Sequence, residues 1–316
     1  MGKSYQAGIP HGLMFHHFHD GRHPRSPGSL SQGTFDQVLQ FVGIQRILNP
    51  EEWLDRLDNG QLRENDLCLT FDDALRSQLD VALPVLEKYN LKAFWFVYSS
   101  VFEGSMERLE LYARFRATHF GNIDEFYELF FDRVRLSGRT IDVPEAEITS
   151  IRSAHPFYSK NDVVFRLLRD RVLGKKVYEE LMDGILADLG VDVSTLARNL
   201  WMSSPDLRYL ADTGHLVGLH SYSHPTVLGS LSYADQLDEY RRNFLHLVEA
   251  CGRKPLAMSH PCNSYNAITI GILKELGIRC GFRSNMRPPD AAGRLNPSSY
   301  EIAREDHANV FAILDT

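Results

Sequence analysis

The stretch LCLTFDDALRSQ, residues 67–78, runs from a short apolar segment directly into two adjacent aspartates, Asp72 and Asp73. Neighbouring carboxylates repel each other, so the pair needs either a structural partner or a positive ion. One interpretation is helix capping, because either aspartate is able to accept hydrogen bonds from the first N–H groups of a helix through residues 74–89. The other is a cation site, and the choice between them depends on the rest of the chain.

Short apolar runs that end in polar residues alternate with amphipathic segments along most of the chain. We expect the apolar runs to be strands buried on both faces, and they are residues 12–18, 66–73, 92–100, 215–224, 254–261 and 278–285. This alternation indicates a parallel α/β sheet or barrel. In such folds, functional side chains gather at the carboxyl ends of the strands.

A long segment between the third and fourth predicted strands breaks this rhythm. Its apolar residues recur at helical spacing, and one face carries Tyr178, Leu181, Met182, Ile185 and Leu189. We therefore predict three parts: residues 1–102 as the first part of the α/β domain, 103–200 as a helical insertion, and 201–316 as the second part. The apolar stripe favours a core or an interface over a cofactor site.

Composition narrows the class of protein. The 316 residues carry a net charge of −7 and no basic run, so nucleic acid is not an expected partner. The start has no uninterrupted apolar stretch, and no apolar run reaches the length of about 18 residues that a membrane span needs. We therefore expect a cytoplasmic protein with at most peripheral membrane contact. Its four cysteines form no CxxC pair, which favours reduced thiols.

A second motif, HSYSH, supplies His220 and His224 directly after an apolar run. This spacing lets two imidazoles converge on one ion, although such a pair by itself is also typical of a solvated turn. Both the aspartate pair and the histidine pair fall at predicted strand ends, where residues distant in sequence meet. Two histidines and one carboxylate leave coordination positions open, which is typical of a catalytic metal site.

The motifs TFDD (70–73) and HSYSH (220–224), after the strand LMFHH (13–17), resemble the polysaccharide deacetylase family, the NodB-homology domain of carbohydrate esterases. The resemblance covers residues 12–102 and 200–307. It implies a distorted (β/α) barrel of about seven strands, interrupted here by the helical insertion. It also implies that Asp73, His220 and His224 bind one divalent transition metal ion, with zinc expected, and that Asp72 is the general base.

The resemblance assigns the remaining catalytic roles with two departures. Where relatives have a motif of the form R-x-P-Y-G, this chain has SHPCN (259–263), so the backbone N–H of Cys262 is the candidate oxyanion donor. No arginine stands near Ser259, so Arg283 or Arg304 would have to orient the base from another strand.

The usual late leucine-x-histidine motif, which supplies the general acid in relatives, is not visible in this chain. His16 is our first candidate for the acid because it aligns with a histidine in the first strand of the relatives, although it is also able to serve as a purely structural histidine of the barrel. The other candidate acids are His19, His260 and His307. Candidate substrate-binding residues are His19, His260, Asn263, Arg283 and Arg304, although Asn263 also suits a plain turn.

We expect this chain to be a hydrolase that removes the acyl group from an acylamino sugar. A nucleotide sugar or a lipid-linked surface glycan such as O-antigen is the expected substrate, with a role in lipopolysaccharide biosynthesis. The alternatives are a catalytically inactive carbohydrate-binding or assembly protein, and a hydrolase of another non-peptide C–N bond. The insertion, which includes the polar and aromatic stretch 152–162, is expected to be a lid that sets substrate choice, a homodimerisation arm, or both.

Overall fold

The computed structural model describes residues 5–154 and 158–314 and separates into two compact units. One unit comprises residues 1–106 and 199–316, and we call it the barrel unit. The other comprises residues 107–198, and we call it the helical unit. The chain therefore leaves the barrel unit after its third strand and returns before its fourth.

The barrel unit is built on seven parallel strands in the order β6-β5-β4-β3-β2-β1-β7. The two outer strands approach each other, because Phe282 at the end of β6 bridges Ile302, and the Arg283 N–H donates to the Ile302 carbonyl at 2.8 Å. The sheet is thus nearly closed, which confirms the predicted seven-stranded barrel. The strands are β1 (His11–Phe15), β2 (Leu67–Asp72), β3 (Phe94–Val97), β4 (Leu216–Leu219), β5 (Ala257–Ser259), β6 (Cys280–Phe282) and β7 (Arg304–Asp306).

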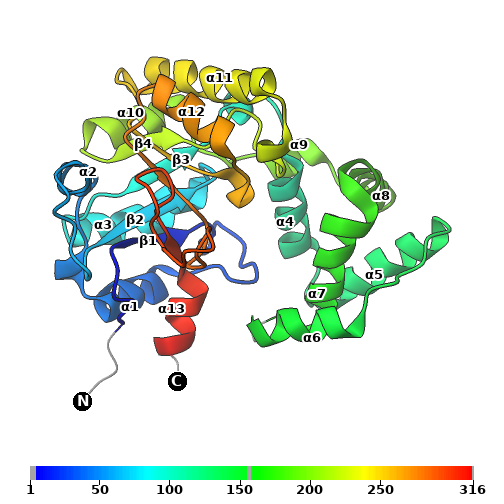
Figure 1. Ribbon diagram of the computed structural model, residues 1–316. Helices are drawn as coiled ribbons and strands as arrows, with labels where there is room; N and C mark the ends of the chain where they lie inside the picture. The colour runs from blue at the N-terminus through cyan, green and yellow to red at the C-terminus, as the bar shows by residue number, and fades with distance from the viewer. Residues whose placement is uncertain (1–4, 155–157, 315–316) are drawn as a thin grey trace. The chain divides into compact units, whose positions relative to one another are not determined.

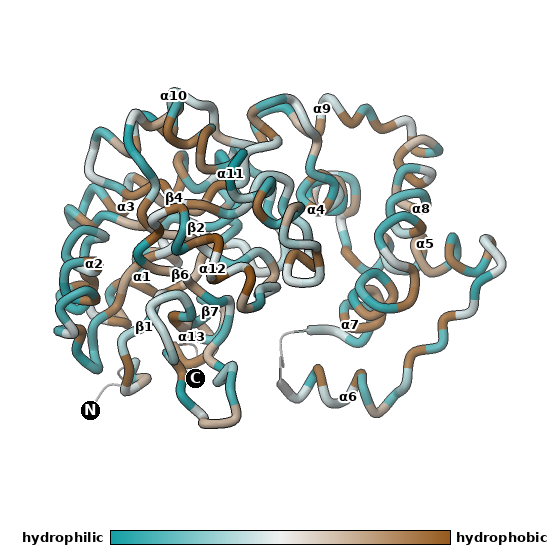
Figure 2. The backbone as a smooth tube through the Cα atoms, turned by 45° about the horizontal axis from the view of Figure 1, so that its top comes forward, coloured by the Kyte–Doolittle hydropathy of each residue, from teal (hydrophilic) through white to brown (hydrophobic). Residues whose placement is uncertain are grey.

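Helices surround these strands (Figure 1). Every residue of β1, β2 and β3 is buried, as their continuous apolar sequences predict. Figure 2 shows the resulting contrast between the hydrophobic strands and the mixed hydropathy of the helices. The helices of this unit are α1 (Gln32–Val42), α2 (Pro50–Asp58), α3 (Leu83–Lys88), α10 (Ser204–Asp212), α11 (Tyr233–Cys251), α12 (Ala267–Glu275) and α13 (His307–Leu314), with short turns η1 (Ile44–Arg46), η2 (Gln78–Ala82), η3 (Ser100–Glu103), η5 (Leu228–Ser230) and η6 (Pro261–Asn263).

Buried aromatic rings tie neighbouring strands together. Phe71 of β2 stacks on Trp95 of β3 with ring centroids 4.4 Å apart, and on Phe15 of β1 at 5.5 Å. Near the start of β4, the Nδ1 atom of His215 accepts hydrogen bonds from the Ala93 N–H and the Trp95 indole N–H, both at 3.1 Å. Burial lowers the pKa of His215 to about 3, with a further contribution from Lys92, so the ring stays neutral.

The helical unit consists of α4 (Arg108–His119), α5 (Ile123–Leu136), α6 (Glu145–Ala154), α7 (Lys160–Leu167), η4 (Leu168–Leu173), α8 (Gly174–Asp188) and α9 (Val193–Ala197). Its core contains packed aromatic rings, among them Phe130 and Phe165, which meet edge to face with ring centroids 5.0 Å apart. The predicted apolar stripe lies on α8: Tyr178, Met182 and Ile185 are buried, and Leu189 is exposed.

Most of the stripe on α8 is therefore core, and a dimer through it stays a prediction. Of the stretch 152–162, residues 155–157 lie outside the described residues. Within residues 5–154 and 158–314, none of the helices combines the length and apolar character that crossing a membrane requires.

Candidate functional site

The two predicted motifs meet at the carboxyl end of the barrel. Asp72 is the last residue of β2 and Asp73 follows it, while His220 follows β4. Strand β3 pairs with both β2 and β4, so only one strand separates the two motifs. Neither carboxylate caps the following helix through a hydrogen bond to its backbone within the described chain, so the capping interpretation does not account for the pair.

Asp73, His220 and His224 each point one ligand atom at a common centre, and these atoms lie within 4.8 Å of one another. Asp73 Oδ1 lies 3.4 Å from His220 Nε2 and 3.6 Å from His224 Nε2. This oxygen is buried and accepts no hydrogen bond that meets normal geometry, which is costly unless a cation or a proton faces it. The three residues therefore fit a divalent transition metal ion.

The orientation of His220 supports the same fit. Its Nδ1–H donates to the Ser259 carbonyl at 2.8 Å, which fixes the tautomer and leaves Nε2 facing Asp73. Burial lowers the pKa of His220, but the carboxylates of Asp72 and Asp73 outweigh this and raise it. Burial likewise raises the pKa of Asp73, and the surrounding imidazoles outweigh it and hold that pKa well below its usual range. Two buried carboxylates thus create a site that favours positive charge.

Asp72 is held by a buried arginine. Arg304 is fully buried and donates two parallel hydrogen bonds to the Asp72 carboxylate, at 2.8 Å to Oδ1 and 2.7 Å to Oδ2. Ser259 adds a bond from its Oγ to Asp72 Oδ2 at 3.2 Å and accepts one from Arg304 at 2.7 Å. Burial raises the pKa of Asp72, but the Arg304 guanidinium together with the His220 and His16 rings outweighs it and keeps that pKa below its usual value. Asp72 is therefore a fixed carboxylate at neutral pH.

Gly12 makes room for this arginine. It lies on β1 opposite Arg304 of β7, and β1 separates β7 from β2. A Cβ atom at Gly12 would lie 3.0 Å from Arg304 Cγ and 3.2 Å from Thr70 Cγ2. Any side chain larger than that of glycine at position 12 would displace the Arg304 side chain, which crosses β1 to reach Asp72 on β2.

Left-handed backbone conformations concentrate around the site. Eight non-glycine residues of the described chain have a positive φ, and six of them flank the three strand ends. Such conformations cost about 1–3 kcal/mol each and persist only where other contacts determine them. The six residues are Asp73, Ala74, Ser221, His224, Cys262 and Asn263.

His16 follows β1 and lies beside both carboxylates. Its Nε2 is 3.7 Å from Asp72 Oδ2 and 3.9 Å from Asp73 Oδ2, and 28% of its side chain is exposed. Its position agrees with a proton donor at the mouth of the site. The buried amide of Gln78 donates to the His16 carbonyl at 2.8 Å and to the Asp72 carbonyl at 2.6 Å, and so ties the two strand ends together.

The other histidines named from the sequence are engaged elsewhere. His19 Nδ1 lies 2.8 Å from Ser29 Oγ. His307 is buried and its Nε2 donates to the Gly28 carbonyl at 2.8 Å. His260 Nε2 donates to the Tyr300 carbonyl at 2.8 Å, and burial lowers the pKa of His260 to about 3, so its ring is neutral.

The remaining predicted residues separate into two kinds. Arg283 is buried and donates to the carbonyls of Glu301, Arg287 and Leu295, so it braces loops and does not contact Asp72. Asn263 Oδ1 accepts the Ser284 N–H at 3.0 Å. Cys262 is the one exposed cysteine of the four and has φ 49°, in the turn that follows β5.

Sequence reasoning passed over several residues of this site. Ser259 contacts Asp72 from the position near which relatives carry an arginine, and that correspondence was an available signal. Gln78 stands in a helical segment whose sequence carries no motif. Both become recognisable only when the strands are assembled.

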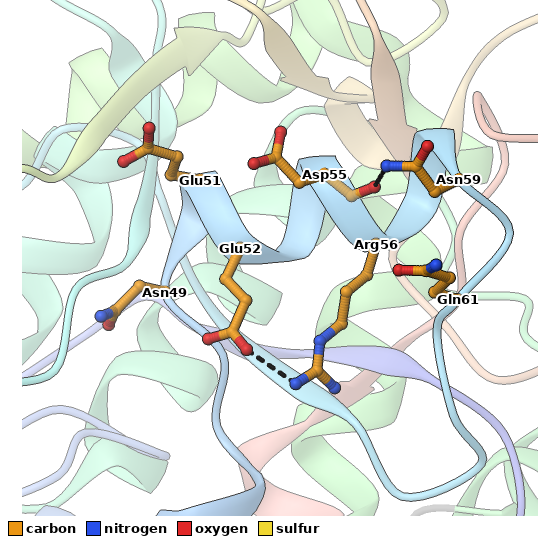
Figure 3. Close-up of a pocket in the computed structure, with 7 residues that line it drawn as sticks. All are labelled: Asn49, Glu51, Glu52, Asp55, Arg56, Asn59 and Gln61. Atoms are coloured by element: carbon orange, nitrogen blue, oxygen red, sulfur yellow. Dashed lines mark hydrogen bonds and ion pairs between the residues drawn. The ribbon is translucent and has the colours of Figure 1, made fainter.

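A pocket lies along α2, lined by side chains of that helix and its flanking loops (Figure 3). The loop before α2 pairs with the starts of β2 and β3, since Leu48 N–H donates to the Leu67 carbonyl and Asn49 Oδ1 accepts the Lys92 N–H. Within the pocket lining, Arg56 donates to Glu52, and Asp55 pairs with Arg279 outside it. We assign no chemistry to it.

Comparisons with known proteins concern the family and the fold. Residues 183–281 match the family model described as polysaccharide deacetylase, a range that includes His220, His224 and the SHPCN turn. The predicted resemblance to this family, whose members are metal-dependent hydrolases, is confirmed. A search of curated proteins found no match.

Solved structures share the fold. The deacetylase PplD from Streptococcus pyogenes, solved in complex with acetate, is 18% identical with a TM-score of 0.55, and the match covers 96% of this chain and 93% of that one. IcaB from Ammonifex degensii is 17% identical with a TM-score of 0.52 over 96% and 93%. The BpsB deacetylase domain from Bordetella bronchiseptica is 13% identical with a TM-score of 0.52 over 96% and 98%.

Proposed function

We propose that this polysaccharide deacetylase-like chain is a metal-dependent hydrolase that removes the acyl group from an acylamino sugar. The observation that carries the proposal is the pair of carboxylates with divided roles. Asp73 faces His220 and His224, whereas Asp72 next to it is held by two hydrogen bonds from Arg304. A metal site next to an oriented base is the arrangement that amide hydrolysis requires.

Each residue has one task in the proposed reaction. When bound by Asp73, His220 and His224, a divalent ion such as zinc supplies Lewis acidity toward the amide carbonyl and acidifies water. Asp72 accepts a proton from the attacking water while the water oxygen adds to the carbonyl carbon. The backbone N–H of Cys262 donates to the oxyanion. His16 protonates the nitrogen as the C–N bond breaks, which releases a carboxylic acid anion and a free amino sugar.

The substrate class rests on the family and on one neighbour. The family match concerns polysaccharide deacetylases, and PplD was solved with acetate, the product of deacetylation. We therefore favour an acetamido sugar. A nucleotide sugar or lipid-linked glycan such as O-antigen, and a cytoplasmic location, remain predictions from the sequence.

The rival proposal is an inactive barrel that binds carbohydrate. Its main support is the missing arginine near Ser259. In this fold Arg304 arrives from β7 and contacts Asp72 with both terminal nitrogens. A binding protein gains nothing from a buried carboxylate locked beside a metal site, because such a pair is costly to bury. The observation therefore favours an enzyme.

Metal analysis and an amine-release screen test the proposal together. Purified protein is expected to hold one equivalent of transition metal per chain, and His220→Ala and His224→Ala are expected to lose it. The screen would compare acetylated nucleotide sugars with acetylated glucosamine oligomers and detect the free amine. A protein that binds one metal but releases no amine from any of them would support the binding protein, and one that binds no metal would end the proposal.

A further inference from the structure

Residues 220–224, which we call the histidine loop, join the two proposed metal-binding histidines. Ser221 has φ 64° and His224 has φ 54°, so the loop contains two left-handed residues that are not glycine. Within the loop, the Ser221 hydroxyl accepts the His224 N–H at 3.1 Å. A contact within the loop does not fix where the loop stands relative to Asp73. Contacts from outside the loop must do so.

The first outside contact comes from Asn243 on α11. Its side chain is fully buried, and its Oδ1 accepts the His220 backbone N–H at 3.0 Å, which also donates to the Val97 carbonyl at 3.2 Å. Its Nδ2 donates to the Val97 carbonyl at 2.8 Å and to Ser99 Oγ at 2.6 Å. Asn243 thus joins the end of β4, where the histidine loop begins, to the end of β3.

The second contact comes from Glu239, four residues earlier on α11 and on the same face of the helix. Its Oε2 accepts the N–H groups of Tyr222 at 2.9 Å and Ser223 at 2.8 Å. Its Oε1 accepts the Ser223 hydroxyl at 2.6 Å. One carboxylate therefore satisfies three donors in the middle of the histidine loop.

We propose that Asn243 and Glu239 are positioning residues that hold the histidine loop in the conformation in which His220 and His224 both face Asp73. The inference rests on the proposed metal site. Partners that orient metal-binding residues usually act on the ligand ring, and their loss costs about 10–100-fold in metal affinity. Here the contact is to the backbone of the loop. Helix α11 acts together with the end of β3, because the Ser99 and Ser100 N–H groups donate to the Tyr222 carbonyl at 3.0 and 2.8 Å.

Two variants remove these contacts, and each has a matched control. Asn243→Ala is paired with Gln236→Ala, because Gln236 is also a fully buried amide of α11 but bonds to the Leu231 carbonyl and Thr269 Oγ1. Glu239→Ala is paired with Glu249→Ala, an exposed glutamate on the same helix. Glu239→Gln serves as a rescue, because its amide oxygen still accepts both N–H groups and its NH₂ faces the Ser223 hydroxyl.

The dissociation constant for zinc, measured by competition with a chromogenic chelator, is the main readout. We expect Asn243→Ala and Glu239→Ala to weaken zinc binding by about 10–100-fold. Gln236→Ala, Glu249→Ala and Glu239→Gln are expected to stay within about threefold of the wild type. The visible spectrum of the cobalt-loaded protein reports ligand geometry and is expected to change in the same two variants only.

The outcomes separate this inference from the proposed function. If the wild type binds no metal, the proposed site fails and the inference fails with it. If the wild type binds metal and both alanine variants keep its affinity and spectrum, the inference is overturned while the proposed function stands. Glu239 lies on a partly exposed face, so its variants keep the test valid even if Asn243→Ala does not fold.

Discussion

Arg304 is the residue whose removal most directly tests the arrangement of this site. The guanidinium is fully buried and donates to both Asp72 oxygens, to Ser259 Oγ and to the Arg283 carbonyl. Arg304→Met keeps an unbranched side chain but removes both guanidinium bonds from the buried Asp72, which keeps the Ser259 hydroxyl at 3.2 Å and the His16 ring at 3.7 Å. Breaking a buried pair in this way costs about 3–5 kcal/mol of folding free energy. That is a large share of a typical stability of about 5–15 kcal/mol.

The measurement is urea unfolding in the presence of chelator, because bound metal adds its own stabilisation. Arg304→Met, Asp72→Asn and the double variant form a double-mutant cycle. The sum of the two single-variant losses in unfolding free energy is expected to exceed the loss in the double variant by about 2 kcal/mol or more. Arg279→Met is the control: Arg279 also binds carboxylates, those of Asp55 and Asp58, but its side chain is 32% exposed. Its loss is expected to cost at most about 1 kcal/mol.

The same variant carries a kinetic prediction with a defined sign. In the wild type, burial raises the Asp72 pKa, and Arg304 is the largest of the groups that together lower it below its usual value. Without the guanidinium, burial raises that pKa, so a smaller fraction of Asp72 is ionised at any acidic pH. The acidic limb of the pH profile of kcat/KM therefore moves to higher pH. Three results together would refute the pairing of Arg304 with Asp72 and its role in catalysis. They are a stability cost of Arg304→Met below about 1 kcal/mol, a coupling energy between the two residues below about 0.5 kcal/mol, and an acidic limb of the kcat/KM profile that does not move.

Four further changes test other parts of the molecule. Asp72→Asn is expected to lower turnover by about 10²–10⁴-fold with one equivalent of metal retained, and loss of the metal would contradict the divided roles. Gly12→Ala places a methyl group 3.0 Å from Arg304 Cγ and is expected to lower the free energy of unfolding by about 1–3 kcal/mol in urea. An unchanged unfolding midpoint would contradict the path of the Arg304 side chain across β1 at Gly12. The pKa of His215 is lowered to about 3 in the folded protein, so the unfolded chain takes up a proton first as pH falls and the folded state loses stability below the unfolded pKa. The wild type is therefore expected to lose about 2 kcal/mol more stability between pH 7 and 5 than His215→Asn does. An equal loss of stability in the two proteins would show that His215 is not the group that takes up the proton. Replacing residues 107–198 by a Gly/Ser linker is expected to change the preference between a small acetamide and a glycan, and equal preference in a folded, metallated protein would exclude a role in substrate choice.

The sequence allowed the barrel to be predicted because buried parallel strands leave a simple signal. Strands β1, β2 and β3 are continuous apolar runs, and each ends in polar residues. The same feature located Asp73, His220 and His224, since the carboxyl ends of parallel strands share one edge. Short motifs were sufficient here because each proposed ligand lies within a few residues of a strand end.

The residues that hold those ligands were not predictable in the same way. Asn243 and Glu239 lie in the middle of an amphipathic helix, where a polar residue usually faces solvent. Nothing in the sequence distinguishes Asn243, which is fully buried, from the exposed polar residues around it. Its role follows from the rotation of α11 about its axis, which tertiary packing decides.

Arg304 shows where a motif-based argument reaches its limit. Relatives supply an arginine from the turn that follows the strand equivalent to β5, and its loss from this chain suggested an impaired site. Closure of the barrel places β7 beside β1, and Gly12 opens a path across β1 to Asp72 on β2. The Arg304 guanidinium comes from β7, which lies on the opposite side of β2 from β5 in the strand order, and it still donates two hydrogen bonds to the Asp72 carboxylate. What the chemistry requires is a buried cation in contact with Asp72, and a closed barrel lets any strand close enough to Asp72 provide it.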